Sequence, residues 1–549
     1  MAALLVLVLL PRVLALGADP PADFHFHFLD DEGWWAHNAY LHARFGRWVM
    51  DDLNPSLFAA PAYTVVLAGV YRAFGIGLAQ TRLLSGLSGF LTCLLLYVLL
   101  RTRLSPGRAL VPALSLGLSY FMLSNNRVGF TESFQLLLIT ASFAAIVHSA
   151  RHSGWAVTGG VCFVLALLAK PSAIAMAPVF VGFWAAHFLF ARRLGFAVPF
   201  SFRSPVLFSL AALGTLLSVA ILLVLPNWDA VKAALAVNLR MAYAGTGDAR
   251  ILLFGWEGLG LVVNGFFIQS AVLLLAVVLV AIGRLAGTIR TPPDLTELFS
   301  WVWLVGTLLF LAAQRYQPDR RFLLLMPPVA IVASLALREG VYLPARGTLS
   351  GDLAWWRRAL IGGLIGGFVG IFAVPVLGKL GVIATAGVGW SQAEATMVWT
   401  TCVLVGIVTM PAACALLPQE PRRLAGAWLW VLFLVYDPGR FLVYTTHLTY
   451  TFRDASRALA SLSAAWKPAE QVMTGKFADS FALDTKIFSF TIRRWPFNQS
   501  YANVDGWERF RPSIVLVETS DKSPEDLVEI RQRGFLAYRE FKLWPDRHG

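Results

Sequence analysis

Charged residues are scarce in this chain: Asp, Glu, Lys and Arg make up 14% of its 549 residues, whereas 57% are apolar. A chain with so few charges has too little polar surface to enclose one water-soluble core of this size. Cysteine is also rare, and the four cysteines lie in apolar runs without CxxC spacing: Cys93, Cys162, Cys402 and Cys414. They are interpreted as small apolar side chains, and neither a disulfide framework nor a zinc site is supported.

Long apolar stretches, in contrast, are abundant. Leu83–Leu100, Val206–Pro226 and Ile361–Leu377 are each long enough to cross a bilayer as a helix, at about 20 residues a crossing. Counted in this way, the chain is predicted to be a polytopic α-helical membrane protein with roughly 13 transmembrane helices. Met1–Gly17 is predicted to be the first span, because it lacks the basic start of a cleaved signal peptide.

The formal charge of +13 would suggest a nucleic-acid partner if the chain were soluble. Here the basic residues form short clusters between apolar runs, which indicates membrane topology, and no nucleic-acid partner is expected. Loops rich in Lys and Arg stay in the cytoplasm, so these clusters are assigned to that side: Arg101–Arg108, Arg151, Arg192–Arg193, Arg284–Arg290, Arg338–Arg358 and Arg422–Arg423. The other loops then face the outside: Asp30–Asp52, Asn125–Glu132, Lys170, Asn227–Trp256 and Gln314–Arg321.

This alternation requires that Pro61–Phe74 does not cross the membrane, because a crossing there would move Arg101–Arg108 to the outside. The segment contains aromatic residues interrupted by Arg72, a composition that suits a helix lying in the outer interface.

Residues 1–443 are therefore predicted to form one transmembrane module. Its first outer loop, residues 18–81, is large enough to form a wall of an active site. Beyond this module the composition becomes that of a soluble protein, and strand-like and helix-like runs follow one another: Gln471–Thr474, Ser513–Glu518, Pro524–Arg533 and Phe535–Leu543. Residues 444–549 are predicted to be a small extracytoplasmic α/β domain.

The densest polar cluster follows the first span and consists of Asp30, Asp31 and Glu32, with His37 shortly after. Three adjacent carboxylates repel one another, so a cation, a metal ion or a raised pKa must compensate them. A divalent ion among these three carboxylates is physically allowed. The simpler alternative is a solvated helix start, because acidic residues favour the first turn of a helix.

Cations collect on the same predicted side: Arg127 beside Glu132, Lys170, Arg320 and Arg321. Outer basic residues depart from the charge rule for membrane proteins, and guanidinium groups bind phosphate in a forked geometry. Taken singly, these residues could also anchor helices or bind lipid headgroups. Together with the carboxylates they suit a lipid-linked phosphate held by cations while a carboxylate deprotonates an incoming hydroxyl.

These polar elements follow one another along the membrane module: Asp31-Glu32-Gly33-Trp34-Trp35, Asn126-Arg127 with Glu132, Leu168-Ala169-Lys170-Pro171-Ser172-Ala173, and Arg320-Arg321-Phe322-Leu323-Leu324 with Pro327-Pro328. In their order and spacing they resemble the GT-C glycosyltransferases, specifically the glycosyltransferase family 39-like branch. That branch contains the protein O-mannosyltransferases, the lipid A aminoarabinose transferase and bacterial relatives.

The resemblance implies an enzyme that transfers a sugar from a polyprenyl-phosphate donor, with inversion, to a glycan, lipid or protein acceptor at the outer face. It implies Asp31 as general base, with Glu32 also catalytic. Asp30, His37 and Glu132 are expected to position substrates, and Arg127, Lys170, Arg320 and Arg321 are candidates for the donor phosphate. Aminoarabinose-type members carry Lys-Pro-Pro in the first loop, where this chain has Ala59-Ala60-Pro61-Ala62, so one phosphate contact of that group is absent.

The expected location is a bacterial inner or plasma membrane, with lipids around the spans and the active site on the extracytoplasmic side. A transporter or flippase of lipid-linked sugars is the alternative from another class. It predicts ionisable residues buried in the middle of spans and a pair of broken helices. In this sequence the charges collect at the outer ends instead, which favours the transferase.

Overall fold

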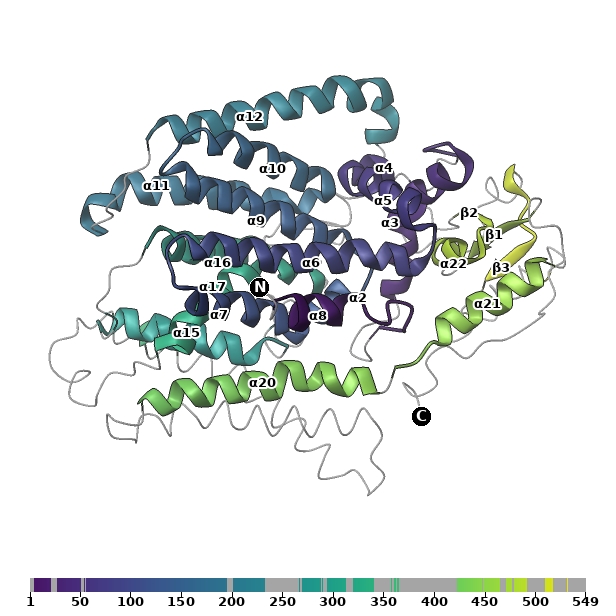
Figure 1. The fold of residues 1–549 in the computed structure, drawn as a ribbon. Coiled ribbons are helices and arrows are strands. Elements are labelled where there is room, and N and C mark those ends of the chain that lie inside the picture. The colour runs from purple at the N-terminus through teal and green to yellow at the C-terminus, as the bar shows by residue number, and fades with distance from the viewer. Residues whose placement is uncertain are drawn as a thin grey trace.

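The structure is a computed structural model, and most of the residues that it describes are helical (Figure 1). The described residues are 4–20, 27–50, 54, 56–194, 201–232, 266, 269–287, 289, 294–312, 319–339, 357, 360–361, 363–364, 422–446, 448–464, 471–475, 478–490, 509–516 and 531.

One group of helices lies side by side at the top of Figure 1: α6 (Leu78–Arg101), α9 (Thr131–Ser149), α10 (Trp155–Ala169), α11 (Met176–Leu194) and α12 (Arg203–Val219). The rest of the bundle consists of α7 (Pro106–Leu118), α8 (Tyr120–Asn126), α15 (Ala271–Leu285), α16 (Leu295–Ala312), α17 (Met326–Glu339) and α20 (Arg422–Thr446). Short turns complete it: η1 (Leu5–Leu9), α2 (Leu10–Val13), η2 (Pro171–Ala175), η3 (Ala220–Val224), η4 (Leu225–Asn227) and η6 (Asp319–Leu325).

Four described helices are long and apolar enough to cross a membrane: Leu78–Arg101, Thr131–Ser149, Pro171–Leu189 and Arg203–Lys232. Shorter apolar helices cover Trp155–Ala169, Ala271–Leu285 and Leu295–Leu311. The predicted spans Leu83–Leu100 and Val206–Pro226 fall within two of the four, whereas Ile361–Leu377 lies almost wholly outside the described residues. The count of roughly 13 stays a prediction, because it includes such segments. Within Met1–Gly17 the described helical turns end at Val13, so they are shorter than the predicted first span.

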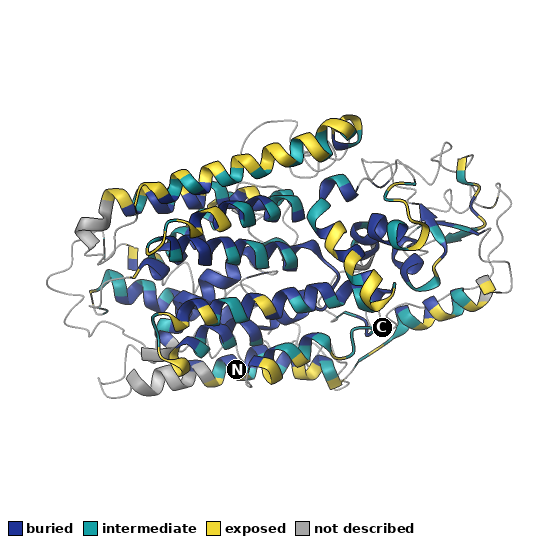
Figure 2. Cartoon of the chain, turned by 45° about the horizontal axis from the view of Figure 1, so that its top comes forward, coloured by how far each residue is buried: buried dark blue, intermediate teal, exposed yellow. Residues whose placement is uncertain are grey.

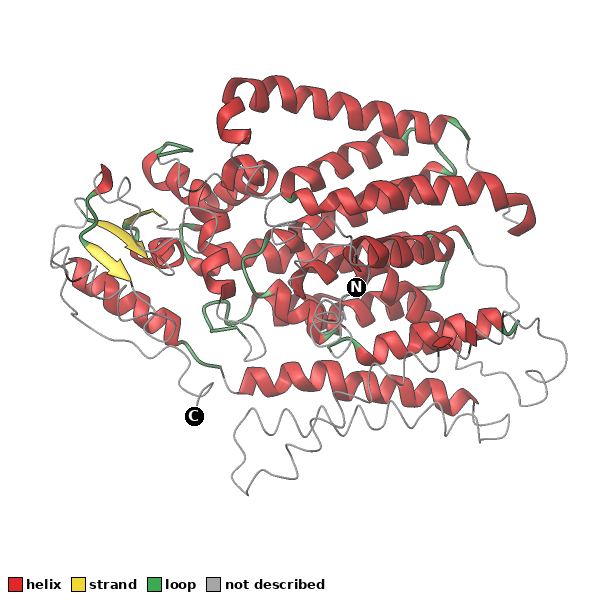
Figure 3. Ribbon diagram, turned by 180° about the vertical axis from the view of Figure 1, so that it is seen from behind, coloured by secondary structure: helices red, strands yellow, loops and turns green. Residues whose placement is uncertain are grey.

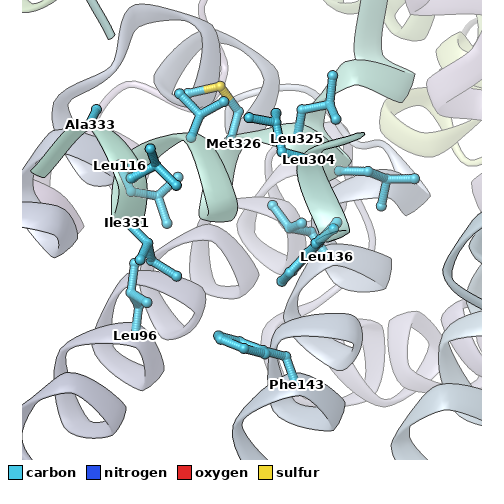
Figure 4. Close-up of a cluster of buried hydrophobic side chains, with 14 of the residues drawn as sticks. Leu96, Leu116, Leu136, Phe143, Leu304, Leu325, Met326, Ile331 and Ala333 are labelled. Carbon is cyan, nitrogen blue, oxygen red and sulfur yellow. The ribbon is translucent and has the colours of Figure 1, made fainter. Parts of the chain in front are cut away.

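The main core of the bundle is a large cluster of buried apolar side chains, part of which is drawn in Figure 4. Leu96 of α6, Leu116 of α7 and Leu136 of α9 meet Met326 and Ile331 of α17 there. Helices in lipid gain little from burying apolar surface against one another, so close van der Waals packing must hold them together. The outer face of α12 is apolar but exposed, as expected for a helix facing lipid (Figure 2).

The loops predicted to be cytoplasmic and the loops predicted to face the outside lie at opposite ends of this bundle. Helices α6 and α9 both begin at the end where the outer-loop residues gather, and therefore both finish at the other end. At that other end, Arg103 lies 3.8 Å from Asp294, and Arg284 forms an ion pair with Glu297. The predicted basic loops after α6 and α15 thus share one end of the bundle.

A second body covers the end where α6 and α9 begin (Figure 3). The first loop contributes α3 (His27–Phe45), α4 (Ser56–Ala59) and α5 (Pro61–Phe74), and the C-terminal region contributes α21 (Thr451–Ala464), α22 (Ala478–Thr485), β1 (Val472–Gly475), β2 (Phe488–Phe490) and β3 (Ile514–Leu516). The strands form a parallel sheet in the order β2-β1-β3. Because parallel strands need a crossover connection, α22 lies between β1 and β2 in the chain.

The predicted helix at Pro61–Phe74 is present as α5, and the strands predicted at Gln471–Thr474 and Ser513–Glu518 overlap β1 and β3. Strand β2 was not predicted. Apart from Arg531, the helix-like runs Pro524–Arg533 and Phe535–Leu543 lie outside the described residues. A single apolar cluster joins side chains of the first loop, such as Trp35 and Tyr63, to C-terminal ones such as Phe481.

Candidate active site

Asp31 and Glu32 lie near the start of α3, at the end of the bundle that the first loop covers (Figure 1). The Asp31 side chain is 35% exposed, and its Oδ2 lies 2.6 Å from Nη2 of Arg320 in η6. The side chain of Asp30 is outside the described part of the structure. The acidic start of α3 therefore meets an arginine almost 290 positions later, a pairing that the sequence alone could not specify.

Glu132, at the start of α9, holds two cations. Its Oε1 accepts a hydrogen bond from Nζ of Lys170 and lies 2.9 Å from Nε of Arg320. Arg320 thereby bridges Glu132 and Asp31. The structure brings together four predicted site residues, Asp31, Arg320, Glu132 and Lys170, into one chain of alternating charge, which we call the charge chain.

Two aromatic rings lie against the cations of the charge chain. Nζ of Lys170 lies 4.9 Å from the ring centre of Trp35, and the guanidinium of Arg320 lies 5.0 Å from that of Phe130. Trp35 follows Asp31 by one helical turn, so both side chains lie on the same face of α3. Cation–π contacts in such buried surroundings stabilise each charge by about 2 kcal/mol, and they add to the orientation of the two cations.

Glu32 has entirely different surroundings. Nε and Nη2 of Arg82 donate a forked pair of hydrogen bonds to its two carboxylate oxygens, at 2.8 and 2.9 Å, and the side chains are 0% and 1% exposed. The backbone N–H of Gly129 donates to Oε1 of Glu32 as well. Sequence reasoning did not single out Arg82 as a site residue. A charge within the apolar helix α6 was the signal available, because such a charge needs a partner.

The loop before α9 depends on the glycine at position 129. A Cβ there would lie 2.6 Å from Cγ2 of Thr81 and 3.3 Å from Oε1 of Glu32. Tyr63 donates a hydrogen bond to the Gly129 carbonyl at 3.1 Å, and Ser85 donates to the Phe130 carbonyl at 3.0 Å. These contacts place the loop between α5 and α6, with Phe130 beside Arg320.

Arg127 and His37 make contacts away from the charge chain. Arg127 donates hydrogen bonds to three backbone carbonyls of the N-terminal segment, those of Pro11, Leu14 and Ala15. His37 is buried, and its Nδ1 lies 3.3 Å from Oδ1 of Asp479. Arg321 follows Arg320 in η6 and is partly buried. Arg127 and His37 were both predicted to bind substrate. In the described contacts, Arg127 instead holds the N-terminal segment and His37 holds α22.

The carboxylates whose side chains the structure describes, Asp31, Glu32 and Glu132, do not fit a resident divalent ion. Arg82 occupies both oxygens of Glu32, Arg320 occupies Oδ2 of Asp31, and Oε1 of Glu132 faces two cations. Within the ranges that the structure describes, no group of three or more His, Cys, Asp or Glu side chains could hold a metal. A hard cation needs several oxygen ligands at once, so we derive no step through a metal.

The charge chain offers one partly exposed carboxylate beside buried cations. Asp31 can receive a proton from a substrate, whereas Glu32 is enclosed and Glu132, at 2% exposure, is held by Lys170 and Arg320. Cations in such dry surroundings interact with an anion more strongly than they would in water. The arrangement is thus suited to accepting a proton and stabilising a departing anion within one site.

Known structures share this fold over nearly the whole chain. ArnT from Cupriavidus metallidurans bound to undecaprenyl phosphate matches at a TM-score of 0.59 and 18% identity, covering 97% of this chain and 93% of that one. The apo state of the same protein matches at a TM-score of 0.57 over the same shares. The archaeal oligosaccharyltransferase AglB from Archaeoglobus fulgidus matches at 0.43 and 12% identity, over 89% of this chain and 64% of that one, too distantly to support an argument.

No family model matches the sequence, and neither does any curated protein. At 18% identity the likeness to ArnT, the lipid A aminoarabinose transferase, shows the fold alone. The predicted resemblance to GT-C glycosyltransferases is therefore confirmed for the fold.

Proposed function

We propose that this chain is an inverting glycosyltransferase that moves a sugar from a polyprenyl-phosphate donor to an acceptor at the extracytoplasmic face of the membrane. The charge chain carries the proposal, because Asp31 is its one partly exposed carboxylate and lies 2.6 Å from Arg320. The bound undecaprenyl phosphate of ArnT, which has the same fold, supports a lipid-phosphate donor.

In the proposed reaction, Asp31 acts as general base. An acceptor hydroxyl attacks the anomeric carbon on the face opposite the phosphate while Asp31 takes the hydroxyl proton. The bond between the anomeric carbon and the phosphate oxygen breaks, and its electron pair leaves with the polyprenyl phosphate. One displacement at the anomeric carbon inverts its configuration.

Lys170 and Arg320 stabilise the negative charge that develops on the leaving phosphate. Both side chains are less than a tenth exposed, so water screens them little. Glu132 keeps the two cations in place between turnovers, because it contacts both through one oxygen. Trp35 and Phe130 limit the directions in which the cations can move.

The extracytoplasmic location of the site is part of the proposal. The charge chain lies at one end of the bundle, and Arg103 and Arg284 lie at the other. Since basic loops remain in the cytoplasm, the charge chain then faces the outside of a bacterial plasma membrane, with the C-terminal α/β region above it.

One observation favours the alternative of a transporter for lipid-linked sugars. Asp437 and Arg440 are buried within α20, and Asp437 accepts a hydrogen bond from the backbone N–H of Tyr120, where α7 and α8 are interrupted. Buried charges beside a broken helix are typical of transport pathways. Such a protein would move the donor across the membrane without breaking the sugar–phosphate bond.

The test supplies purified protein in detergent with synthetic polyprenyl-phosphate sugars and with glycan, lipid or protein acceptors, and it measures acceptor-dependent release of polyprenyl phosphate. Loss of a general base predicts that Asp31→Asn slows release by about 100-fold or more. Asp294→Asn is the matched control, because Asp294 lies at the other end of the bundle and is half exposed. Release that Asp31→Asn leaves unchanged would contradict the proposed role of Asp31. Movement of intact donor in vesicles, without release, would support the transporter.

A further inference from the structure

Helix α22 of the C-terminal region packs against α3. The N–H of Gly33 donates a hydrogen bond to Oγ of Ser480 in α22 at 3.0 Å. A Cβ on Gly33 would lie 2.1 Å from the backbone nitrogen of Ser480, so only glycine permits this approach. The contact lies two residues after Asp31, and a movement of α22 would therefore move the carboxylate.

Asp479 adds a buried charge to this contact. Its Oδ1 lies 3.3 Å from Nδ1 of His37 and accepts a hydrogen bond from Ser489 of β2 at 2.8 Å. Its Oδ2 accepts a hydrogen bond from Asn54 at 3.2 Å, and Asn54 also donates to the Trp34 carbonyl at 3.0 Å. One aspartate thus ties the sheet to α3 and to the segment that follows it.

The other end of α22 is attached to α6. Oδ1 of Asp484 accepts a hydrogen bond from the backbone N–H of Leu78, the first residue of α6, at 3.0 Å. One turn later, Arg82 of α6 forms the forked pair with Glu32. Helix α22 therefore sets the relative position of α3 and α6, the two helices that orient the acidic start of the site.

We propose that α22 is a positioning element for the catalytic carboxylate and that Asp479 is its principal positioning residue. The C-terminal region then sets the rate of transfer itself, in addition to any part in acceptor choice. The inference rests on the proposed function, because it concerns the placement of Asp31 as general base. A displacement of about 1 Å in a reacting group lowers turnover by on the order of 100-fold.

Binding of the donor phosphate should change less than turnover. Lys170, Arg320 and Glu132 come from η6 and from the ends of α9 and α10, whereas α22 packs against α3, α6, α21, β1 and β2. Loss of the Asp479 contacts should therefore lower kcat by a larger factor than it raises the donor KM, although Asp31 and Trp35 of α3 also contact Arg320 and Lys170. A purely structural loss would instead reduce the amount of folded protein without changing turnover per folded molecule.

The experiment compares the full-length wild type with Asp479→Asn and with a second variant, Ser480→Ala, which removes the hydroxyl that accepts the hydrogen bond from Gly33. Asp454→Asn, an exposed aspartate of α21, is the matched control. Turnover, donor KM and polyprenyl phosphate binding are measured on folded protein isolated by gel filtration.

We expect kcat to fall by about 10- to 100-fold in Asp479→Asn and less in Ser480→Ala, with a smaller change in donor KM and in polyprenyl phosphate binding, and Asp454→Asn like the wild type. Unchanged kcat in folded Asp479→Asn, or in folded Ser480→Ala if the first variant does not fold, would overturn the inference. So would a change confined to the KM of the acceptor. A wild type that transfers no sugar would contradict the proposed function instead, so the two failures are distinguishable.

Discussion

Asp31 and Glu32 are consecutive residues of α3 with opposite surroundings. Asp31 is partly exposed beside Arg320, whereas Glu32 is enclosed and bound through both oxygens to Arg82. A pattern of adjacent acids predicts that cations must be near, and it cannot tell which acid will meet which cation. From the geometry we propose that Glu32 fixes α3 to α6 while Asp31 performs the chemistry.

Removal of Arg82 should destabilise the protein strongly. Arg82→Gln leaves the buried Glu32 carboxylate without its counter-ion, which costs about 3–5 kcal/mol. The double variant with Glu32→Gln should recover part of this loss, because no unpaired charge remains. Thermal unfolding in detergent measures both.

Arg103→Gln provides the comparison for Arg82, because the partner of Arg103 is half exposed and such a pair contributes at most about 1 kcal/mol. Equal losses of stability in Arg82→Gln and Arg103→Gln would contradict the burial of the pair between Glu32 and Arg82.

Asp479 should make stability depend on pH in the acidic range. Burial works against ionisation of Asp479, but the pair with His37 and hydrogen bonds from Ser489 and Asn54 hold its pKa below the ordinary value of 3.8. The folded carboxylate therefore contributes stability above that value and loses it as the pH falls through its lower folded pKa. The difference in melting temperature between wild type and Asp479→Asn should therefore be larger at pH 5 than at pH 3. A difference that stays constant down to pH 3 would count against this charge pair.

Much of the charge chain could be predicted from single residues. Lys170 and Arg320 depart from the rule that basic residues avoid outer loops, which is a local signal. Both residues belong to the charge chain. Arg127 gives the same signal but binds backbone carbonyls of the N-terminal segment. Which basic residue faces a ligand and which faces the backbone depends on tertiary packing, and the sequence pattern does not contain it.

At the scale of elements, the loop before α9 has little freedom. Gly129→Ala would push a methyl group against Thr81 and the oxygen of Glu32, so we expect a loss of about 1–3 kcal/mol together with lower turnover. Gly107→Ala in α7 is the control, because no atom lies within 4 Å of its added Cβ and alanine favours the helix. Thermal unfolding and donor turnover of both variants test this. If Gly129→Ala behaved like Gly107→Ala, the close approach of the loop to Thr81 would be wrong.

Elements with a strong periodic or compositional signal were predictable. Helix α5 at Pro61–Phe74 and strands β1 and β3 lie where the sequence places them. Strand β2, Phe488–Phe490, was not predicted although β3 is equally short, because Ser489 interrupts its apolar run whereas the run of β3 is continuous. The interruption between α7 and α8 was not predicted either. It is stabilised by the hydrogen bond from the Tyr120 N–H to Asp437, which lies in the distant helix α20.

At the scale of the whole molecule, the charge chain lies at one end of the bundle and the basic loops after α6 and α15 lie at the other. Between them α12 presents an apolar face in which Leu213 is 54% exposed. Such a face is typical of a surface that meets lipid or another protein. Composition and apolar run length predicted this arrangement, whereas the docking of the C-terminal region on α3 required the three-dimensional structure.

The lipid-facing role of α12 leads to a further prediction. Leu213→Arg places a charge near the middle of α12 and should disfavour membrane insertion by about 2.5–3.5 kcal/mol. Leu213→Ile should insert like the wild type. The fraction of protein that remains in the membrane after alkaline extraction measures the effect. Unchanged insertion of Leu213→Arg would mean that this face of α12 meets protein or water.

The central claim is a single displacement in which Asp31 takes the acceptor proton, and the anomeric configuration of the product tests it most directly. A donor of known configuration is given to the wild type, and the product is examined by NMR. The account predicts the opposite configuration in the product, because the acceptor attacks the face away from the phosphate. A product with retained configuration would contradict it, since retention requires two displacements through a covalent sugar–enzyme intermediate.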